Sequence, residues 1–257
     1  MFAFGELKEM VIRIRLVLLG LLFGVSIFSS GTVARAAGPD VYVLNTSTGA
    51  PYANKEETGF QNLVVAEVFR RIGLKARVKQ YVASARAMSN ANANIDHGVA
   101  MRIKGLEKKF PNLVRVEERL VENDFVAYSR NLVFKSNSWQ SLLPYRVAYI
   151  HGWVIFERNL MRSQEKHAVY KPEQMFDMLG KKRVDLVLYE RWQGLQRAME
   201  TGLVVKVHEP PLAAVDMYMY VHKSHAHLAP ELAKALREMK ADGSYQKLFD
   251  RTLTVLK

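Results

Sequence analysis

From residue 41 to the C-terminus, short apolar runs alternate with amphipathic helical segments. Residues 41–44 predict a strand, residues 63–72 place apolar side chains on one helical face, and residues 75–81 alternate as a second strand. A strand, a helix and a strand in this order predict a parallel βαβ unit, in which the helix has to cover one face of the sheet. This unit constrains the fold to the α/β class.

The same alternation continues along the rest of the chain. Further strands are predicted at residues 99–101, 113–116, 125–128, 145–150, 168–170, 184–188, 203–207 and 216–222. Further helices are predicted at residues 84–94, 157–162, 172–179, 228–242 and 245–256, with another basic helix between Arg102 and residue 113.

We interpret this order as two α/β lobes, the second inserted in the first. The chain leaves lobe 1 near residues 125–131 and returns near residues 217–222, so two strands form the hinge. The predicted organisation is residues 37–128 plus 219–257 for lobe 1 and residues 129–218 for lobe 2. A single continuous sheet would argue against it.

The N-terminus predicts export. Three basic residues precede the apolar run at 16–28, which is short for a membrane span, and Ala34-Arg35-Ala36 offers a cleavage site. Residues 1–36 are therefore predicted to be a secretory signal peptide, with a retained membrane anchor as the alternative and Met10 as a possible start. The chain contains no cysteine, which excludes disulfides, thiolate ligands and an N-terminal lipid anchor. A soluble, non-lipidated periplasmic protein is expected.

The chain without residues 1–36 is basic, with 33 Lys and Arg against 23 Asp and Glu. This balance favours an anionic ligand, a membrane surface or an acidic protein face as partner. Nucleic acid is not expected, because the protein is exported and its basic residues are scattered. The sequence has no G-x-S-x-G, H-E-x-x-H or Gly-rich phosphate motif, so neither catalysis nor a cofactor is predicted. His222, His225 and His227 are read as a solvated linker rather than a metal site.

Two residues stand where a binding cleft is expected. Arg102 ends the apolar run 99–101, and ligands of open α/β sheets collect at the carboxyl ends of strands. The alternative is that Arg102 begins an ordinary surface helix. Tyr52 follows Pro51 in the loop after the first strand and is predicted to stand at the mouth of the cleft, with plain packing as the alternative.

Four segments resemble the extracytoplasmic solute-binding proteins of family 3, the polar amino-acid type with the periplasmic type II fold. They are Ala50-Pro51-Tyr52 with Gly59-Phe60, the Asn-x-Asp-x-Gly end of the small-residue helix with an arginine beyond it, residues 146–152, and residues 218–242. The resemblance covers residues 37–257. Departures are the early position of Arg102, Phe60-Gln61 in place of Phe-Asp, Trp153 in place of a small hydroxyl residue, and Glu190 in place of Asp.

The resemblance implies roles for individual residues. Arg102, with Arg86 as second choice, would pair with the carboxylate of a solute, Glu190 would hold its ammonium group, and Tyr52 would lie against its side chain. Trp153 and Tyr189, which follow or end strands, are further candidates to line the site.

The implied function is capture of a small polar, amino-acid-like or anionic solute between two lobes. A monomer would deliver that solute to the membrane permease of an ABC importer. Two alternatives remain open. One is a periplasmic dehydratase on the same fold, for which Glu190 is the plausible acid. The other is a ligand-sensing or degenerate binding protein without a transport role.

Overall fold

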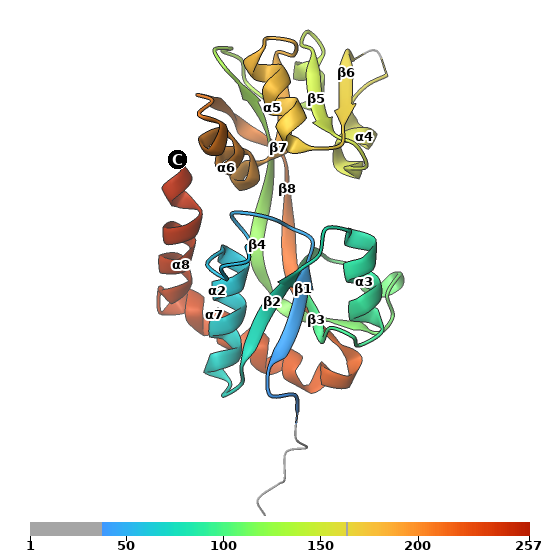
Figure 1. Ribbon diagram of the computed structural model, residues 1–257, viewed down its shortest axis with the longest axis vertical. Coiled ribbons are helices and arrows are strands. Elements are labelled where there is room, and N and C mark those ends of the chain that lie inside the picture. Colours follow the sequence, from blue (N-terminus) through green and yellow to red (C-terminus); the bar gives the residue numbers. More distant parts are fainter. Residues whose placement is uncertain (1–37, 163) are drawn as a thin grey trace, which may run out of the picture. The chain divides into compact units, whose positions relative to one another are not determined.

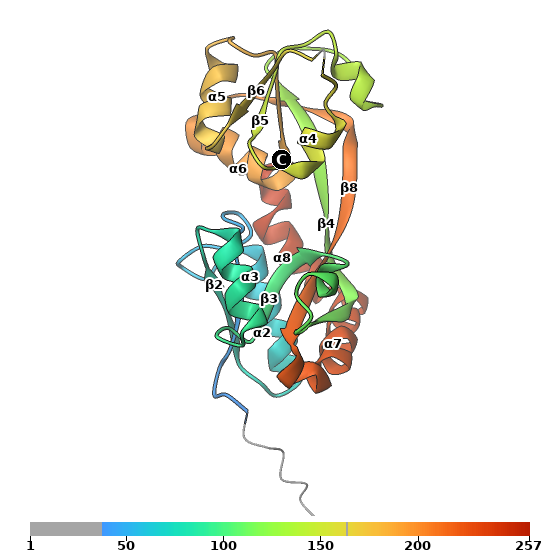
Figure 2. The same cartoon turned by 90° about the vertical axis from the view of Figure 1, so that its right-hand side faces the viewer.

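Two long antiparallel strands connect the two halves of the structure (Figure 1, Figure 2). The computed structural model describes residues 38–162 and 164–257, so the predicted signal peptide lies outside the described residues. Strands β4 (Leu113–Ser129) and β8 (Lys206–His222) each contain 17 residues and pair with each other over most of their length. One end of this strand pair lies in lobe 1, and the other end lies in lobe 2.

Lobe 1 contains the predicted βαβ unit. Strand β1 pairs in parallel with both β2 and β3, and β3 pairs antiparallel with residues 217–221 of β8. The elements of this lobe are β1 (Tyr42–Thr46), α2 (Phe60–Arg71), β2 (Ala76–Gln80), α3 (Ser84–Asn92), β3 (Gly98–Ile103), α7 (Ala229–Ala241) and α8 (Ser244–Thr252). Helices α2 and α7 bury their apolar faces in one core with the strands. The prediction of the βαβ unit is confirmed.

Lobe 2 repeats the α/β arrangement with shorter strands. Strand β5 pairs in parallel with β6 and β7, and β7 pairs antiparallel with residues 125–128 of β4. Its elements are β5 (Val147–Ile150), α4 (Val154–Asn159), β6 (Lys166–Val169), α5 (Pro172–Gly180), β7 (Leu186–Glu190) and α6 (Arg191–Thr201). Short 3₁₀ turns occupy Leu106–Lys108, Trp139–Leu142, Lys223–Leu228 and Thr254–Leu256.

The strands form one hydrogen-bonded series, in the order β2-β1-β3-β8-β4-β7-β5-β6. This continuity comes from β4 and β8 alone, because they extend through both lobes while every other strand pairs within one. The expectation of two separate sheets is therefore wrong as a statement about hydrogen bonding. The two-lobed α/β fold is confirmed.

Three expectations about local structure are wrong. The runs at 113–116 and 125–128 are two ends of the single strand β4. Residues 203–205 are not in a strand, and β8 continues from Lys206 through Pro210 and Pro211. The prolines are tolerated because residues 209–212 of β8 bulge away from the register with β4. The basic helix expected after Arg102 is only a 3₁₀ turn, and helix α6 was not predicted.

The hydrophobic clusters extend across the lobe boundaries that were predicted from the sequence. Val126 and Tyr128 of β4 pack with lobe 2 side chains, although the prediction assigned residues up to 128 to lobe 1. Trp192, at the start of α6, belongs to the core cluster of lobe 1, where its ring meets the edge of Phe249 at 5.5 Å. Helix α6 is thus joined to both lobes. Within the described residues, no helix has both the length and the apolar character that crossing a bilayer requires.

We predict that Gly98→Ala destabilises lobe 1. A Cβ at this position would lie 2.1 Å from the main-chain oxygen of Tyr220, so β3 would have to move away from β8. The free energy of unfolding should fall by about 1–3 kcal/mol in urea denaturation. Gly180→Ala is the control, because its Cβ would meet only Leu203 Cδ1 at an ordinary 3.7 Å. Equal effects of the two substitutions would contradict the prediction.

A second prediction concerns His97, which is half-buried and hydrogen-bonded to Val43 of β1. Its Nδ1 accepts a hydrogen bond from the main-chain N–H of Val43 at 2.8 Å, and the His225 ring lies 5.2 Å away. Burial lowers the pKa of His97. The unfolded state therefore binds more protons than the folded state as the pH falls. The stability contributed by the neutral His97 ring is fully present above about pH 6.5 and is lost at lower pH. His97→Asn, which keeps an acceptor, should lose less stability than the natural chain between about pH 7 and pH 5. Melting temperatures of the natural chain and of His97→Asn that change equally with pH would contradict this prediction.

Candidate functional site between the lobes

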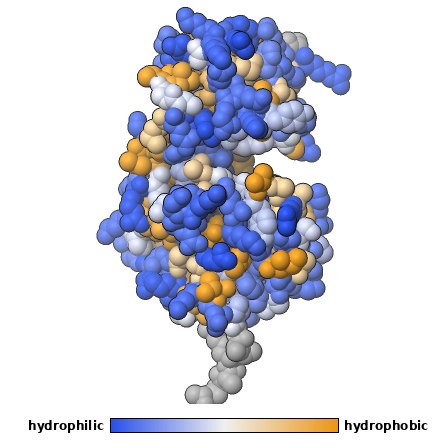
Figure 3. Space-filling model, viewed as in Figure 1, coloured by the Kyte–Doolittle hydropathy of each residue, from blue (hydrophilic) through white to orange (hydrophobic). Residues whose placement is uncertain are grey.

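A cavity of about 400 Å³ lies between the two lobes, beside the crossing strands. Figure 3 shows the indentation between the lobes on one side of the molecule. Both lobes and both long strands contribute to its lining: Ser47, Thr48, Ser84, Met101, Arg102, Asn123, Phe125, Gly152, Trp153, Val154, Ile155, Glu190, Gln193 and Met217. Arg102 and Glu190 are the charged residues in this set.

Arg102 is placed by an irregularity in β3. The register between β3 and β8 shifts between Val99 and Arg102, and such a bulge can redirect a side chain. The guanidinium Nη2 donates to Ser47 Oγ at 2.8 Å and Ser84 Oγ at 3.0 Å, while Nη1 donates to the Met101 carbonyl at 3.1 Å. Burial lowers the pKa of Arg102, but an arginine guanidinium remains protonated in proteins. In the described part of the chain, it forms no ion pair.

Glu190 ends β7 and caps the N-terminus of α6. Its Oε2 accepts from the main-chain N–H of Gln193 at 2.9 Å, and its Oε1 lies 2.9 Å from the hydroxyl of Tyr52. The residue is 1% exposed. Burial raises the pKa of Glu190 to about 7, although the hydrogen bonds act in the opposite direction. This carboxyl therefore changes protonation near neutral pH.

Tyr52 is not at the mouth of the cleft, so that expectation is wrong. Its side chain is fully buried, and its hydroxyl bridges Asn123 Oδ1 at 3.1 Å and Glu190 Oε1 at 2.9 Å. Burial and the neighbouring Glu190 raise the pKa of Tyr52 well above its usual value. Gly59 allows this placement, because a Cβ there would lie 2.5 Å from the Tyr52 carbonyl oxygen. Tyr52 is hydrogen-bonded to Glu190 on the side away from the cavity and does not line the cavity itself.

The aromatic wall of the cavity comes from lobe 2. Trp153 lines the cavity and stacks on Tyr189 with ring centroids 4.8 Å apart, and it meets Phe125 edge-on at 5.9 Å. Tyr189 is buried behind Trp153, and burial raises its pKa. Trp153 is therefore placed to contact a solute, whereas Tyr189 holds the indole in position.

Arg86 is not brought to the cavity. It is exposed on α3, and its guanidinium lies over the Tyr81 ring at 5.9 Å. The structure thus brings Arg102, Trp153 and Glu190 together and leaves Arg86, Tyr52 and Tyr189 outside the lining.

Several lining residues were missed by sequence reasoning. Ser47 lies in a polar loop that follows the first strand, a signal that could have been used. Asn123, Phe125 and Met217 come from the crossing strands, and Gln193 comes from the first turn of the unpredicted α6. No motif marks these positions, because they are brought to the cavity by strand pairing.

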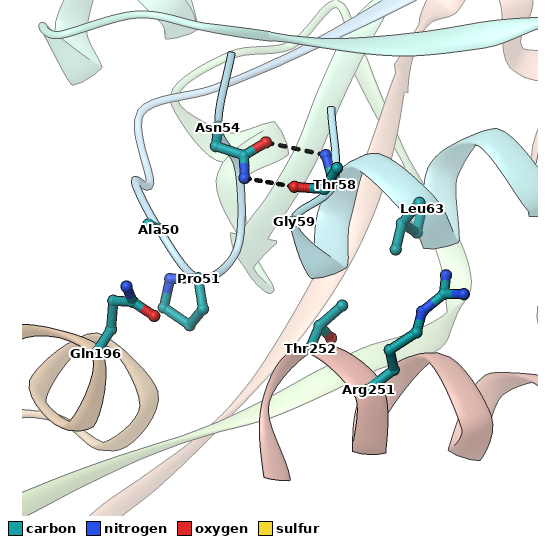
Figure 4. Close-up of a pocket in the computed structure, with 9 residues that line it drawn as sticks. All are labelled: Ala50, Pro51, Asn54, Thr58, Gly59, Leu63, Gln196, Arg251 and Thr252. Atoms are coloured by element: carbon teal, nitrogen blue, oxygen red, sulfur yellow. Dashed lines mark hydrogen bonds between the residues drawn. The ribbon is translucent and has the colours of Figure 1, made fainter. Parts of the chain in front are cut away.

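A larger cavity of about 540 Å³ lies elsewhere, between the loop that precedes α2 and the helices α6 and α8 (Figure 4). Two hydrogen bonds close its loop: the Thr58 N–H donates to Asn54 Oδ1 at 2.9 Å, and Asn54 Nδ2 donates to the Thr58 hydroxyl oxygen at 2.8 Å. Arg251 is its charged side chain, and none of the predicted site residues lines it. Volume alone gives it no chemistry, so the candidate site is the smaller cavity that holds Arg102 and Glu190.

The residues described by the structure contain no group of three or more His, Asp or Glu side chains arranged to hold a metal ion. His225 packs against Tyr42 and His97 at ring distances of 5.2 Å, so it belongs to the lobe 1 interior and not to a solvated linker as expected.

No family model matches the sequence. A protein of Shewanella oneidensis, described only as an uncharacterized protein, is 25% identical over 245 residues, which is 90% of this chain and 91% of the relative.

Solved structures are more informative about the fold. A probable amino-acid ABC transporter extracellular-binding protein from Bacillus subtilis matches with a TM-score of 0.68 and 16% identity, covering 84% of this chain and 99% of its own. An ancestral arginine-binding protein bound to glutamine gives 0.65 and 19%, covering 84% and 99%. A histidine kinase sensor domain with similarity to periplasmic binding proteins gives 0.65 and 14%, covering 83% and 95%. This chain therefore has the two-lobed fold that these periplasmic-type binding proteins share.

Proposed function

We propose that this protein binds a small carboxylate-bearing solute in the cavity between its lobes. The observation that carries the proposal is the state of Arg102. Its guanidinium is held by two serine hydroxyls, has no acidic partner in the described chain, and lines a cavity walled by Trp153. A planar guanidinium meets a carboxylate in two parallel charge-assisted hydrogen bonds, which are stronger in a site that excludes water.

The two crossing strands supply a means of closure. At the crossing, β4 and β8 are paired only with each other, whereas β3 and β7 pair with their lobe 1 and lobe 2 ends. Rotation about such a two-strand connection would close the lobes on a solute, as in hinge-closing binding proteins generally.

We further infer an exported protein that passes its solute to the permease of an ABC importer. The predicted signal peptide supports export. The similarity to a probable ABC transporter extracellular-binding protein supports delivery to an importer.

A ligand-sensing role is the second candidate, favoured by the similarity to a histidine kinase sensor domain. Uptake of a bound, labelled solute into vesicles that contain the permease encoded nearest to this gene would support transport. Binding without uptake, together with activation of a neighbouring sensor kinase, would support sensing.

Arg102→Ala should abolish most of the binding. Removing the guanidinium leaves the solute carboxylate without its partner in the cavity, which should weaken binding by at least about 2 kcal/mol, roughly thirtyfold in Kd. Isothermal titration against amino acids and organic acids gives the measurement. Arg86→Ala is the matched control, because Arg86 is exposed and lies outside the cavity. An unchanged Kd in Arg102→Ala would exclude Arg102 as the carboxylate receptor, and no binding across the panel would contradict solute binding itself.

A further inference from the structure

Three polar side-chain atoms form a chain behind the cavity: Asn123 Oδ1, the Tyr52 hydroxyl and Glu190 Oε1. The hydroxyl lies 3.1 Å from the first and 2.9 Å from the second. A tyrosine hydroxyl has one proton and cannot donate to two acceptors at once. Both contacts are hydrogen bonds if Glu190 carries a proton and donates it to Tyr52, while Tyr52 donates to Asn123.

The other assignment is less favourable. Rotating the Asn123 amide would let its nitrogen donate to Tyr52, and Glu190 could then be ionised. That arrangement buries a carboxylate which, within the described residues, has no ion-pair partner. Burying an unpaired charge costs several kcal/mol. The protonated chain avoids this cost.

The charged groups around Glu190 do not supply a counter-ion. Asp124 is an acid and disfavours a second negative charge nearby. Arg191, the next residue, is engaged by Asp124 at 2.8 Å and by Glu209 at 2.6 Å.

The other neighbours are the following. The Tyr128 hydroxyl contacts the Glu190 main-chain oxygen, Tyr189 is buried beside it, and the first turn of α6 donates the Gln193 N–H to the carboxyl group. Arg102 lines the same cavity but its donors are directed at two serines.

With Glu190 neutral, the lining presents one charge, the cation Arg102. The remaining lining is apolar or neutral, with Trp153 and Phe125 forming the aromatic wall and Met101 and Met217 among the other side chains. We propose that the cavity selects a monocarboxylate with an apolar or aromatic body and an uncharged group, such as a hydroxyl, where an amino acid has its ammonium. This inference rests on the proposed solute binding and deepens it.

Matched ligand pairs test the selection. Phenylalanine and 3-phenyllactate, and leucine and 2-hydroxyisocaproate, differ only in an ammonium or a hydroxyl group. Titration calorimetry on the full exported chain at about pH 6 and about pH 8.5 should show tighter binding of the hydroxy acids. Their Kd should rise by up to about thirtyfold at the higher pH, because the competent, protonated fraction falls above a pKa of about 7.

The opposite result is equally clear. Tighter binding of the amino acids, with affinity that increases with pH, would overturn the selection and leave solute binding intact. Absence of binding by both pairs and by the wider panel would overturn the proposed function together with this inference.

Glu190→Gln isolates the responsible group. Its side-chain oxygen can still cap α6, but it does not titrate, so the ratio of Kd values at the two pH values should approach one. Any pH dependence that remains in this variant comes from groups other than residue 190. A ratio equal to that of the natural chain would overturn the proposal.

A second measurement needs no variant. Calorimetry of the natural chain at about pH 7.5, in buffers of different ionisation enthalpy, counts the protons exchanged on binding. Uptake of a proton with a hydroxy acid supports a protonated Glu190 in the complex. Release of a proton, or no exchange, overturns it.

Discussion

The antiparallel pairing of β4 with β8 is the constraint on which the rest of the structure depends. Each strand is long enough to end in the sheet of one lobe and begin in the sheet of the other, so a single ladder holds both lobes. The same ladder brings Asn123 and Met217 to the cavity. Because hydrogen bonds along the crossing are made only between these two strands, the connection can bend without breaking the sheets on either side.

Three ionisable side chains near the crossing, two of them buried and Arg102 partly buried, have different partners. Arg191 is neutralised by two carboxylates, from Asp124 and Glu209, and forms part of the framework. Glu190 receives hydrogen bonds but no cation, and burial moves its pKa to about 7. Arg102 receives only neutral partners. The absence of a carboxylate partner for Arg102 within the described residues is the observation on which the proposed carboxylate ligand rests.

Much of the fold could be predicted from the sequence, because apolar periodicity reports local structure. The βαβ unit at the N-terminus of lobe 1 follows from it directly. The long strands could not be predicted as such, since Pro210 and Pro211 normally exclude a strand and are accommodated here only by a bulge. Of the residues that line the cavity, Arg102 and Trp153 were named because each follows or ends a strand, whereas Glu190 was named from the family resemblance. Tyr52 was misplaced because sequence does not distinguish a buried tyrosine from an exposed one.

The anchoring of Trp192 in the lobe 1 core has a mechanical consequence. This indole follows Glu190 by two residues and is fixed against Phe249 of α8, so the first turn of α6 cannot travel far when lobe 2 swings. Glu190 is therefore linked to lobe 1 through α6, whereas Trp153, which immediately precedes α4, packs against the core clusters of lobe 2. In the proposed closure, the lobe 2 side chain Trp153 would therefore move toward the polar end of the cavity, which Arg102 and Glu190 form.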